Sequence, residues 1–77
     1  MAVNPDKTLD ASGLSCPLPI VKTKKEIDTL SSGQVLKIIS TDPGSKNDMV
    51  AWCKRTGNEL LDSAEEGGKF LFYVKKA

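Results

Sequence analysis

The sequence predicts an α+β fold, a two-layer α/β sandwich in which two helices cover one face of a four-stranded mixed sheet. Two segments carry apolar residues at helical spacing, and four short segments have the apolar or alternating pattern of strands, in the order β-α-β-α-β-β. The 77 residues form a single domain, 1–77, near the lower size limit for a self-supporting core. Two helices in so short a chain cannot cover both faces of the sheet, so we expect them on the same face.

The first third of the chain reads as an arm, a strand and a helix. Residues 1–6 are polar and predict a flexible N-terminal arm. A short strand is expected at 8–11, followed by a Ser-Gly turn at 12–13. The helix is predicted from 17 to about 30, because its inward-facing residues recur at helical spacing: Ile20, Thr23, Ile27 and Leu30.

The middle of the chain predicts the central strand and the second helix. Residues 34–41 are β-branched and apolar on both faces, which favours a central position in the sheet. After an Asp-Pro-Gly turn, Ser45 with Asp48 three residues later approximates a capping box and begins a helix. Gly57 is expected to end that helix.

The last third of the chain predicts a β-hairpin. Residues 59–65 and 69–75 form its strands, joined by a tight turn at Gly67-Gly68. The sheet face away from the helices should then present moderately apolar residues, and it is either a contact surface or an ordinary open face: Lys37, Leu71 and Tyr73.

Composition excludes several classes of function. Eleven basic and ten acidic residues give no global field, so direct nucleic-acid binding is not indicated. The absence of histidine excludes a Cys-His catalytic pair, and with only two cysteines it excludes a Cys/His zinc site, so no metal is expected. The N-terminus lacks the pattern of a secretory leader and no apolar run is long enough for a membrane span, so we expect a cytoplasmic protein.

Cys16 is the candidate functional residue, within Cys16-Pro17-Leu18-Pro19 at the start of the first helix. Proline is well tolerated in the first helical turn, so we expect Cys16 at the N-cap, Pro17 at N1 and Pro19 at N3. The sulfur would then accept a hydrogen bond from the Leu18 N–H. The helix dipole should lower the thiol pKa below its ordinary value of about 8.5 and make Cys16 a poised nucleophile.

The segment Leu9 to Pro19, with its Gly13-Leu-Ser-Cys-Pro-Leu-Pro run, resembles the signature of the TusA/SirA/YedF family of small sulfur carriers. The resemblance extends over nearly the whole chain. It implies the same two-layer fold and a sulfane sulfur held as a persulfide on Cys16, with no other cofactor. Asp10 matches the family's acidic position before the Gly-Leu turn, where we expect it to support the loop.

The resemblance also implies partners. Sulfur would come from a cysteine desulfurase, a rhodanese or a DsrE-like carrier and pass to an acceptor protein. Such carriers serve tRNA thiolation, molybdenum-cofactor supply or dissimilatory sulfur oxidation. We expect a monomer when free, without efficient turnover of a small substrate by itself. Lys22 and Lys25, on the helix that follows the thiol, are candidates for guiding an acidic partner.

Two alternatives remain at this point. Cys16 could merely cap a helix in a non-catalytic regulatory or interaction module. The protein could also be a dithiol redox switch, with Cys53 as the second thiol. Cys53 falls on the inward face of the second helix, so we favour a buried core thiol.

Overall fold

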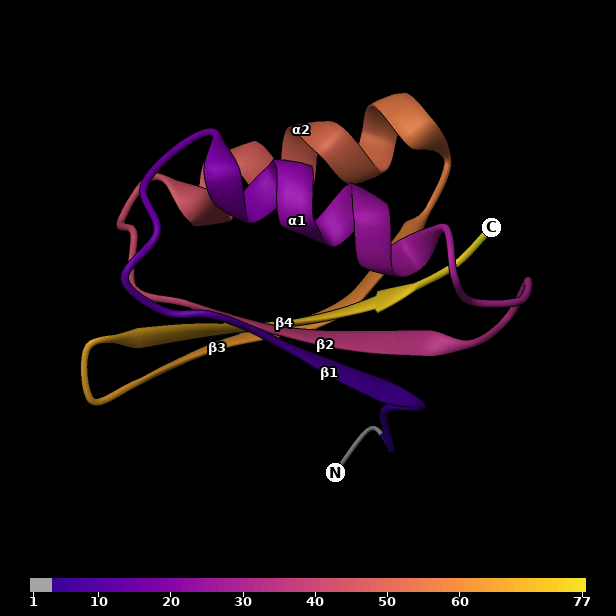
Figure 1. Cartoon of the computed structure of the whole chain (residues 1–77), viewed down its shortest axis with the longest axis horizontal. Helices are drawn as coiled ribbons and strands as arrows, with labels where there is room; N and C mark the ends of the chain where they lie inside the picture. The colour runs from indigo at the N-terminus through magenta and orange to yellow at the C-terminus, as the bar shows by residue number, and fades with distance from the viewer. Residues whose placement is uncertain (1–3) are drawn as a thin grey trace.

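The computed structural model describes residues 4–77 and has the predicted two-layer architecture (Figure 1). Both helices lie on one face of the sheet, and no helix of residues 4–77 covers the opposite face. The elements in chain order are β1 (Lys7–Ala11), α1 (Leu18–Ile27), β2 (Val35–Ser40), α2 (Ser45–Thr56), β3 (Glu59–Glu66) and β4 (Lys69–Lys75).

The sheet has the strand order β1-β2-β4-β3. The central position predicted for β2 is confirmed, since it pairs with β1 on one side and β4 on the other. The β1–β2 pair is parallel and the other pairs are antiparallel, which makes the sheet mixed. Because β1 and β2 run in the same direction with Ala11 opposite Ser40, the loops that follow them leave the same edge of the sheet.

The hydrophobic core lies between the sheet and the two helices. Its buried side chains come from every element except β3: Ala11, Ile27, Leu36, Ile38, Met49, Trp52, Cys53, Phe72 and Val74. Lys37, Leu71 and Tyr73 are half-buried on the uncovered face, where the Lys37 ammonium lies 5.7 Å from the centre of the Tyr73 ring. The prediction that Lys37, Leu71 and Tyr73 lie on the sheet face away from the helices is therefore confirmed.

The structure describes only part of the predicted N-terminal arm, 1–6. Residues 1–3 lie outside the described part of the chain. Asp6 is tied to the sheet, because its N–H donates to the Val35 carbonyl and its carboxylate accepts from the Val35 N–H, both at 2.8 Å. Asp6, the last residue of the predicted arm, is therefore bonded to the start of β2.

Helix α1 is shorter than the predicted 17–30 at both ends. Pro17 occupies the N-cap, so Leu18 is the first helical residue and Pro19 the second. At the other end, the N–H groups of Thr29 and Leu30 donate three residues back, to Glu26 and Ile27, both at 3.1 Å. Such bonds make tighter turns than an α-helix, which explains why the regular helix stops at Ile27.

Glycines with positive φ end α2 and form the turn of the β3–β4 hairpin. Gly57 has a φ of +81° and ends α2 as predicted, with its N–H donating to the Cys53 carbonyl at 2.9 Å. Gly67 and Gly68 both have positive φ, which suits the tight β3–β4 turn. The capping-box prediction was wrong: Gly44 is the N-cap, and the Ser45 hydroxyl donates to the Asp42 carbonyl at 2.7 Å.

Candidate functional site

Cys16 is exposed on the loop between β1 and α1, which we call the thiol loop (residues 12–17). Two backbone N–H groups fix this loop to the segment after β2: Gly13 donates to Thr41 Oγ1 at 2.8 Å and Cys16 donates to Asp42 Oδ2 at 3.2 Å. The parallel pairing of β1 and β2 ends with Ala11 opposite Ser40, so the two segments that follow these strands lie within hydrogen-bonding distance of each other. The thiol therefore projects from a loop that is held at two points.

Gly13 and Asp10 shape the start of the thiol loop. Gly13 has a φ of +81°, a conformation that residues with a Cβ rarely adopt. Asp10 accepts a hydrogen bond from the Ser12 N–H at 3.0 Å. Hydrogen bonding with Ser12 lowers the pKa of Asp10 below its ordinary range, so this carboxylate stays charged and holds the turn.

The prolines act differently from the expected N-cap arrangement. The Cys16–Pro17 peptide bond is cis, and the Pro17 carbonyl accepts from the N–H groups of Ile20 and Val21, each at 3.1 Å. The Leu18 N–H, which we expected to bind the sulfur, donates to the Ser15 carbonyl at 2.9 Å. Pro19, the second residue of α1, is buried, and its carbonyl accepts from the Thr23 hydroxyl at 2.7 Å. Cys16 therefore precedes the N-cap and does not cap the helix.

Two carboxylates surround the thiol. The Cys16 sulfur and one oxygen each of Asp42 and Asp48 lie within 4.8 Å of one another. Asp42 follows β2 and Asp48 lies in the first turn of α2, and both are half-buried. One thiol and two carboxylates lack the four Cys/His ligands of a structural zinc site, so we assign this group an electrostatic role.

The carboxylates reverse the expected effect on the thiol. Hydrogen bonding with Asp48, then partial desolvation, then the negative charges of Asp48 and Asp42 raise the pKa of Cys16 above its ordinary value. The prediction that the helix terminus lowers this pKa was therefore wrong. The physical reason is that Cys16 lies outside the helix and faces two anionic groups.

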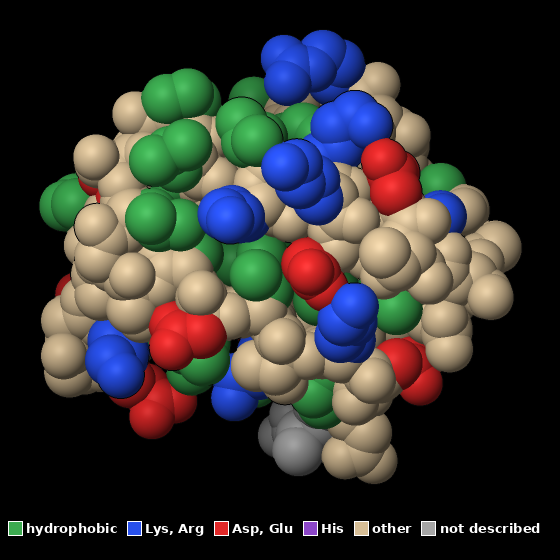
Figure 2. Space-filling view, viewed as in Figure 1, with side chains coloured by type: hydrophobic (Ala, Val, Ile, Leu, Met, Phe, Trp, Pro, Cys, Tyr) green, Lys and Arg blue, Asp and Glu red, His purple; other side chains and the backbone are tan. Residues whose placement is uncertain are grey.

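An exposed apolar patch lies on the helix layer near the thiol loop (Figure 2). We define it as Leu18 and Val21 of α1 and Val50 of α2, which are 45%, 44% and 39% exposed. Lys22 and Lys25 continue the exposed surface of α1, one turn after Leu18 and Val21. Of the site residues predicted on α1, Leu18, Lys22 and Lys25 are therefore exposed on one helix surface, whereas Pro19 is buried.

Cys53 has the opposite environment. Its side chain lies in the core with 3% of its surface exposed, and this burial raises its pKa to about 11. Both cysteines are free thiols. The prediction of a buried core thiol is confirmed. The redox-switch alternative requires Cys53 as an accessible second thiol, and its burial argues against that role.

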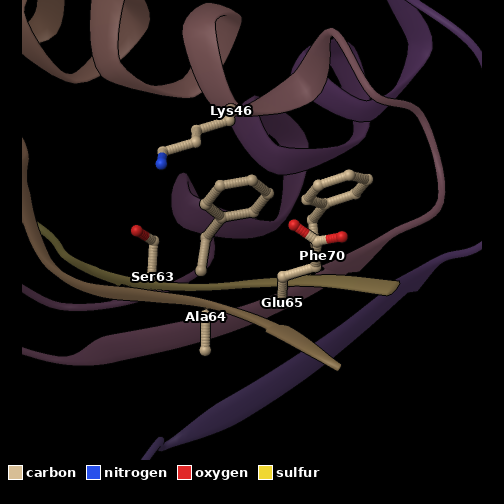
Figure 3. Close-up of a pocket in the computed structure, with 6 residues that line it drawn as sticks. Lys46, Ser63, Ala64, Glu65 and Phe70 are labelled. Carbon is tan, nitrogen blue, oxygen red and sulfur yellow. The ribbon is translucent and has the colours of Figure 1, made fainter. Parts of the chain in front are cut away.

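A separate pocket of about 110 Å³ lies between α2 and the β3–β4 hairpin (Figure 3). The Lys46 side chain reaches into it from α2 toward Ser63 of β3. Cys16 does not line this pocket, so the pocket is not part of the thiol site.

Sequence reasoning missed Thr41 and the roles of Asp42 and Asp48 around the thiol. The available signal was the parallel pairing of β1 and β2, which brings the loops after both strands together. The Asp-Pro-Gly turn after β2 therefore had to lie next to the thiol loop, with its carboxylate within reach of Cys16.

Comparisons of the sequence with known proteins identify relatives of this chain. Residues 7–76 match the family model described as sulfurtransferase TusA. The chain is 61% identical over 72 residues to the sulfur carrier protein TusA of Allochromatium vinosum, covering 94% of this chain and 95% of that protein. It is 51% identical over 71 residues to the putative sulfur carrier protein YrkI of Bacillus subtilis, covering 92% and 95%.

A solved structure supports the fold. The crystal structure of a SirA-like protein from Desulfitobacterium hafniense matches with a TM-score of 0.79 at 21% identity, covering 90% of this chain and 95% of that one. Within the described residues, no helix is long and apolar enough to cross a membrane.

Proposed function

The chain belongs to the TusA family of sulfur carrier proteins, and from this premise we propose that Cys16 carries the sulfur as a persulfide. The observation that carries the proposal is the contrast between the two thiols. Cys16 is exposed on an anchored loop, whereas Cys53 is buried in the core. Only an exposed thiol can meet the sulfur atom of a donor protein.

The proposed loading step is an exchange between sulfur atoms. The Cys16 sulfur attacks the terminal sulfur of a donor persulfide, a new S–S bond forms, and the donor's own S–S bond breaks. The donor sulfur leaves with the electron pair of that bond and takes up the proton that Cys16 gives up. Atoms and electrons balance without an added oxidant or reductant.

Transfer from Cys16 to an acceptor is the same exchange, in which the acceptor thiol attacks the terminal sulfur of the Cys16 persulfide and Cys16 leaves as the thiol. We propose that both steps occur between docked proteins, because the thiol is exposed on a loop that leads directly into the exposed apolar patch at Leu18. Leu18, Val21 and Val50 supply a surface that a partner can cover, and Lys22 and Lys25 add charge at its border. Efficient turnover of a small substrate by the protein alone is not expected.

The donor in this proposal is a cysteine desulfurase, a rhodanese or a DsrE-like carrier. The acceptor serves tRNA thiolation, molybdenum-cofactor supply or dissimilatory sulfur oxidation. Both cysteines are free thiols, which suits the reducing cytoplasm where we place the protein.

The test is a cycle of loading and unloading. Reduced protein is incubated with a cysteine desulfurase and cysteine, and its intact mass is followed over time. We expect one added sulfur atom per chain, which dithiothreitol then removes. Cys16→Ser should gain none, and Cys53→Ala should load like the wild type. Loading that persists in Cys16→Ser would contradict the proposal.

A further inference from the structure

We propose that Asp42 and Asp48 make Cys16 selective for reaction partners that bring positive charge next to the reacting sulfur. The biological meaning of this inference rests on the proposed persulfide on Cys16. The charge preference itself is a property of the free thiol and can be measured without any sulfur transfer.

The first support is that the carboxylates are fixed close to the thiol. Both lie within 4.8 Å of the sulfur through one oxygen each. Asp42 is held by the hydrogen bond from the Cys16 N–H at 3.2 Å, and Asp48 is part of α2. Two anionic groups therefore remain beside the sulfur whenever the loop keeps its structure.

The second support is that no described cation neutralises them. Across residues 4–77, the ion pairs are Lys7–Glu26 and Lys24–Asp28, which use neither carboxylate. Lys46 is near Asp48 in sequence, but its side chain reaches into the pocket toward Ser63 (Figure 3).

The charged groups of the other neighbouring elements do not compensate either. The first turn of α1 carries no charged side chain, and its first lysine is Lys22. Asp10, at the end of β1, is engaged with the Ser12 N–H. The charges that act on the Cys16 sulfur are thus those of Asp48 and Asp42.

These carboxylates have two consequences for sulfur exchange. In the free protein they oppose formation of the thiolate, which is the reactive form, so Cys16 reacts slowly with neutral and anionic electrophiles. A partner that places a Lys or Arg side chain against them offsets this repulsion and favours the thiolate at the moment of docking. We therefore expect the donor to carry a basic residue beside its sulfur-bearing cysteine.

The test compares reagents that differ only in charge. Methanethiosulfonates with an ammonium, an uncharged or a sulfonate end group modify the thiol by the same reaction. Their rates are measured on Cys53→Ala protein, which leaves Cys16 as the single thiol, with a chelator present throughout. At low ionic strength we expect the cationic reagent to react about tenfold faster than the anionic one, after correction for their intrinsic rates.

Variants assign this preference to the two carboxylates. Asp48→Asn and Asp42→Asn should each reduce the ratio to about threefold, and the double variant should bring it near one. Asn at 42 keeps an oxygen that can accept from the Cys16 N–H. Asp62→Asn, which changes an exposed acidic residue on β3, is the matched control and should leave the ratio unchanged. Circular dichroism verifies that each variant is folded.

The outcomes separate this inference from the proposed function. The charge selectivity is overturned if the cationic and anionic reagents react with the wild type at nearly equal corrected rates. It is also overturned if the double variant shows the same rate ratio as the wild type. Either result holds even if the desulfurase loads Cys16. A clear charge preference without loading on Cys16 overturns the persulfide proposal and leaves the selectivity in place.

Discussion

The backbone N–H of Cys16 donates a hydrogen bond to Asp42 Oδ2 at 3.2 Å, across 26 positions of the sequence. This bond joins the thiol loop to the segment after β2 and brings one carboxylate next to the sulfur. With Asp48 from α2, it gives the thiol an anionic environment that its position before a helix would not suggest.

Replacing Asp48 should lower the pKa of Cys16. Hydrogen bonding with Asp48 is the largest cause that raises this pKa, and Asp48→Asn removes the negative charge while keeping a similar shape. The rate of iodoacetamide alkylation against pH, measured in Cys53→Ala protein, reports the shift. The profile of the variant should lie at lower pH than that of its parent, with faster alkylation at neutral pH. A profile that stays in place would contradict the assigned role of Asp48.

The buried thiol should make stability depend on alkaline pH. Burial raises the pKa of the Cys53 thiol to about 11. A raised pKa means that the folded protein favours the neutral thiol, so this contribution is complete below pH 9 and is lost as pH rises toward 11. Urea unfolding across this range should show a smaller decline in Cys53→Ala than in the wild type. Equal declines in both proteins would show that Cys53 does not contribute.

Gly13 should be required for the shape of the thiol loop. Its φ of +81° is unfavourable for any residue with a Cβ, although the space around it is open. Gly13→Ala should therefore lower the free energy of unfolding by about 1 kcal/mol through backbone strain alone. Gly44→Ala is the matched control, because Gly44 has a φ of −78° and an added Cβ would make only ordinary contacts. Equal stability of the two variants in urea would contradict this account.

The lysines of α1 should affect docking rather than the thiol itself. Lys22→Glu combined with Lys25→Glu should slow sulfur transfer from a desulfurase, mainly at low ionic strength, because charge at an interface chiefly sets the association rate. Lys54→Glu with Arg55→Glu makes the same change in charge at the far end of α2 and serves as the control. The measurement is the rate of sulfur transfer to the wild type and to each double variant at two salt concentrations. If both double variants behave alike, the α1 lysines are only a solvated surface and docking must be sought on the open sheet around Leu71 and Tyr73.

Local patterns predicted most of the fold. The alternation in 69–75, the two-sided apolar strand at 34–41 and the Gly67-Gly68 turn each depend on neighbouring residues, and each is found as expected. The C-terminal end of α1 was missed because the tight turns after Ile27 satisfy the backbone in a way that helical periodicity does not reveal.

The chemistry of the site was only partly predictable. The motif singled out Cys16 as the candidate, but its environment depends on Asp42 and Asp48, which lie next to it because β1 and β2 pair in parallel. An argument based on one helix terminus therefore gave the wrong direction for the pKa. The burial of Cys53 followed from its helical spacing and was correctly expected.

The most direct test of the central claim is a competition within one reaction. Equal amounts of Cys16→Ser and Cys53→Ala protein, distinguishable by mass, are incubated together with a cysteine desulfurase and ³⁵S-labelled cysteine, then separated without reductant. Both variants meet the same donor, so differences in donor activity cancel. We predict that the label is found on Cys53→Ala protein, which keeps Cys16, and is absent from Cys16→Ser protein. Label on Cys16→Ser protein would show that the sulfur is carried elsewhere in the chain.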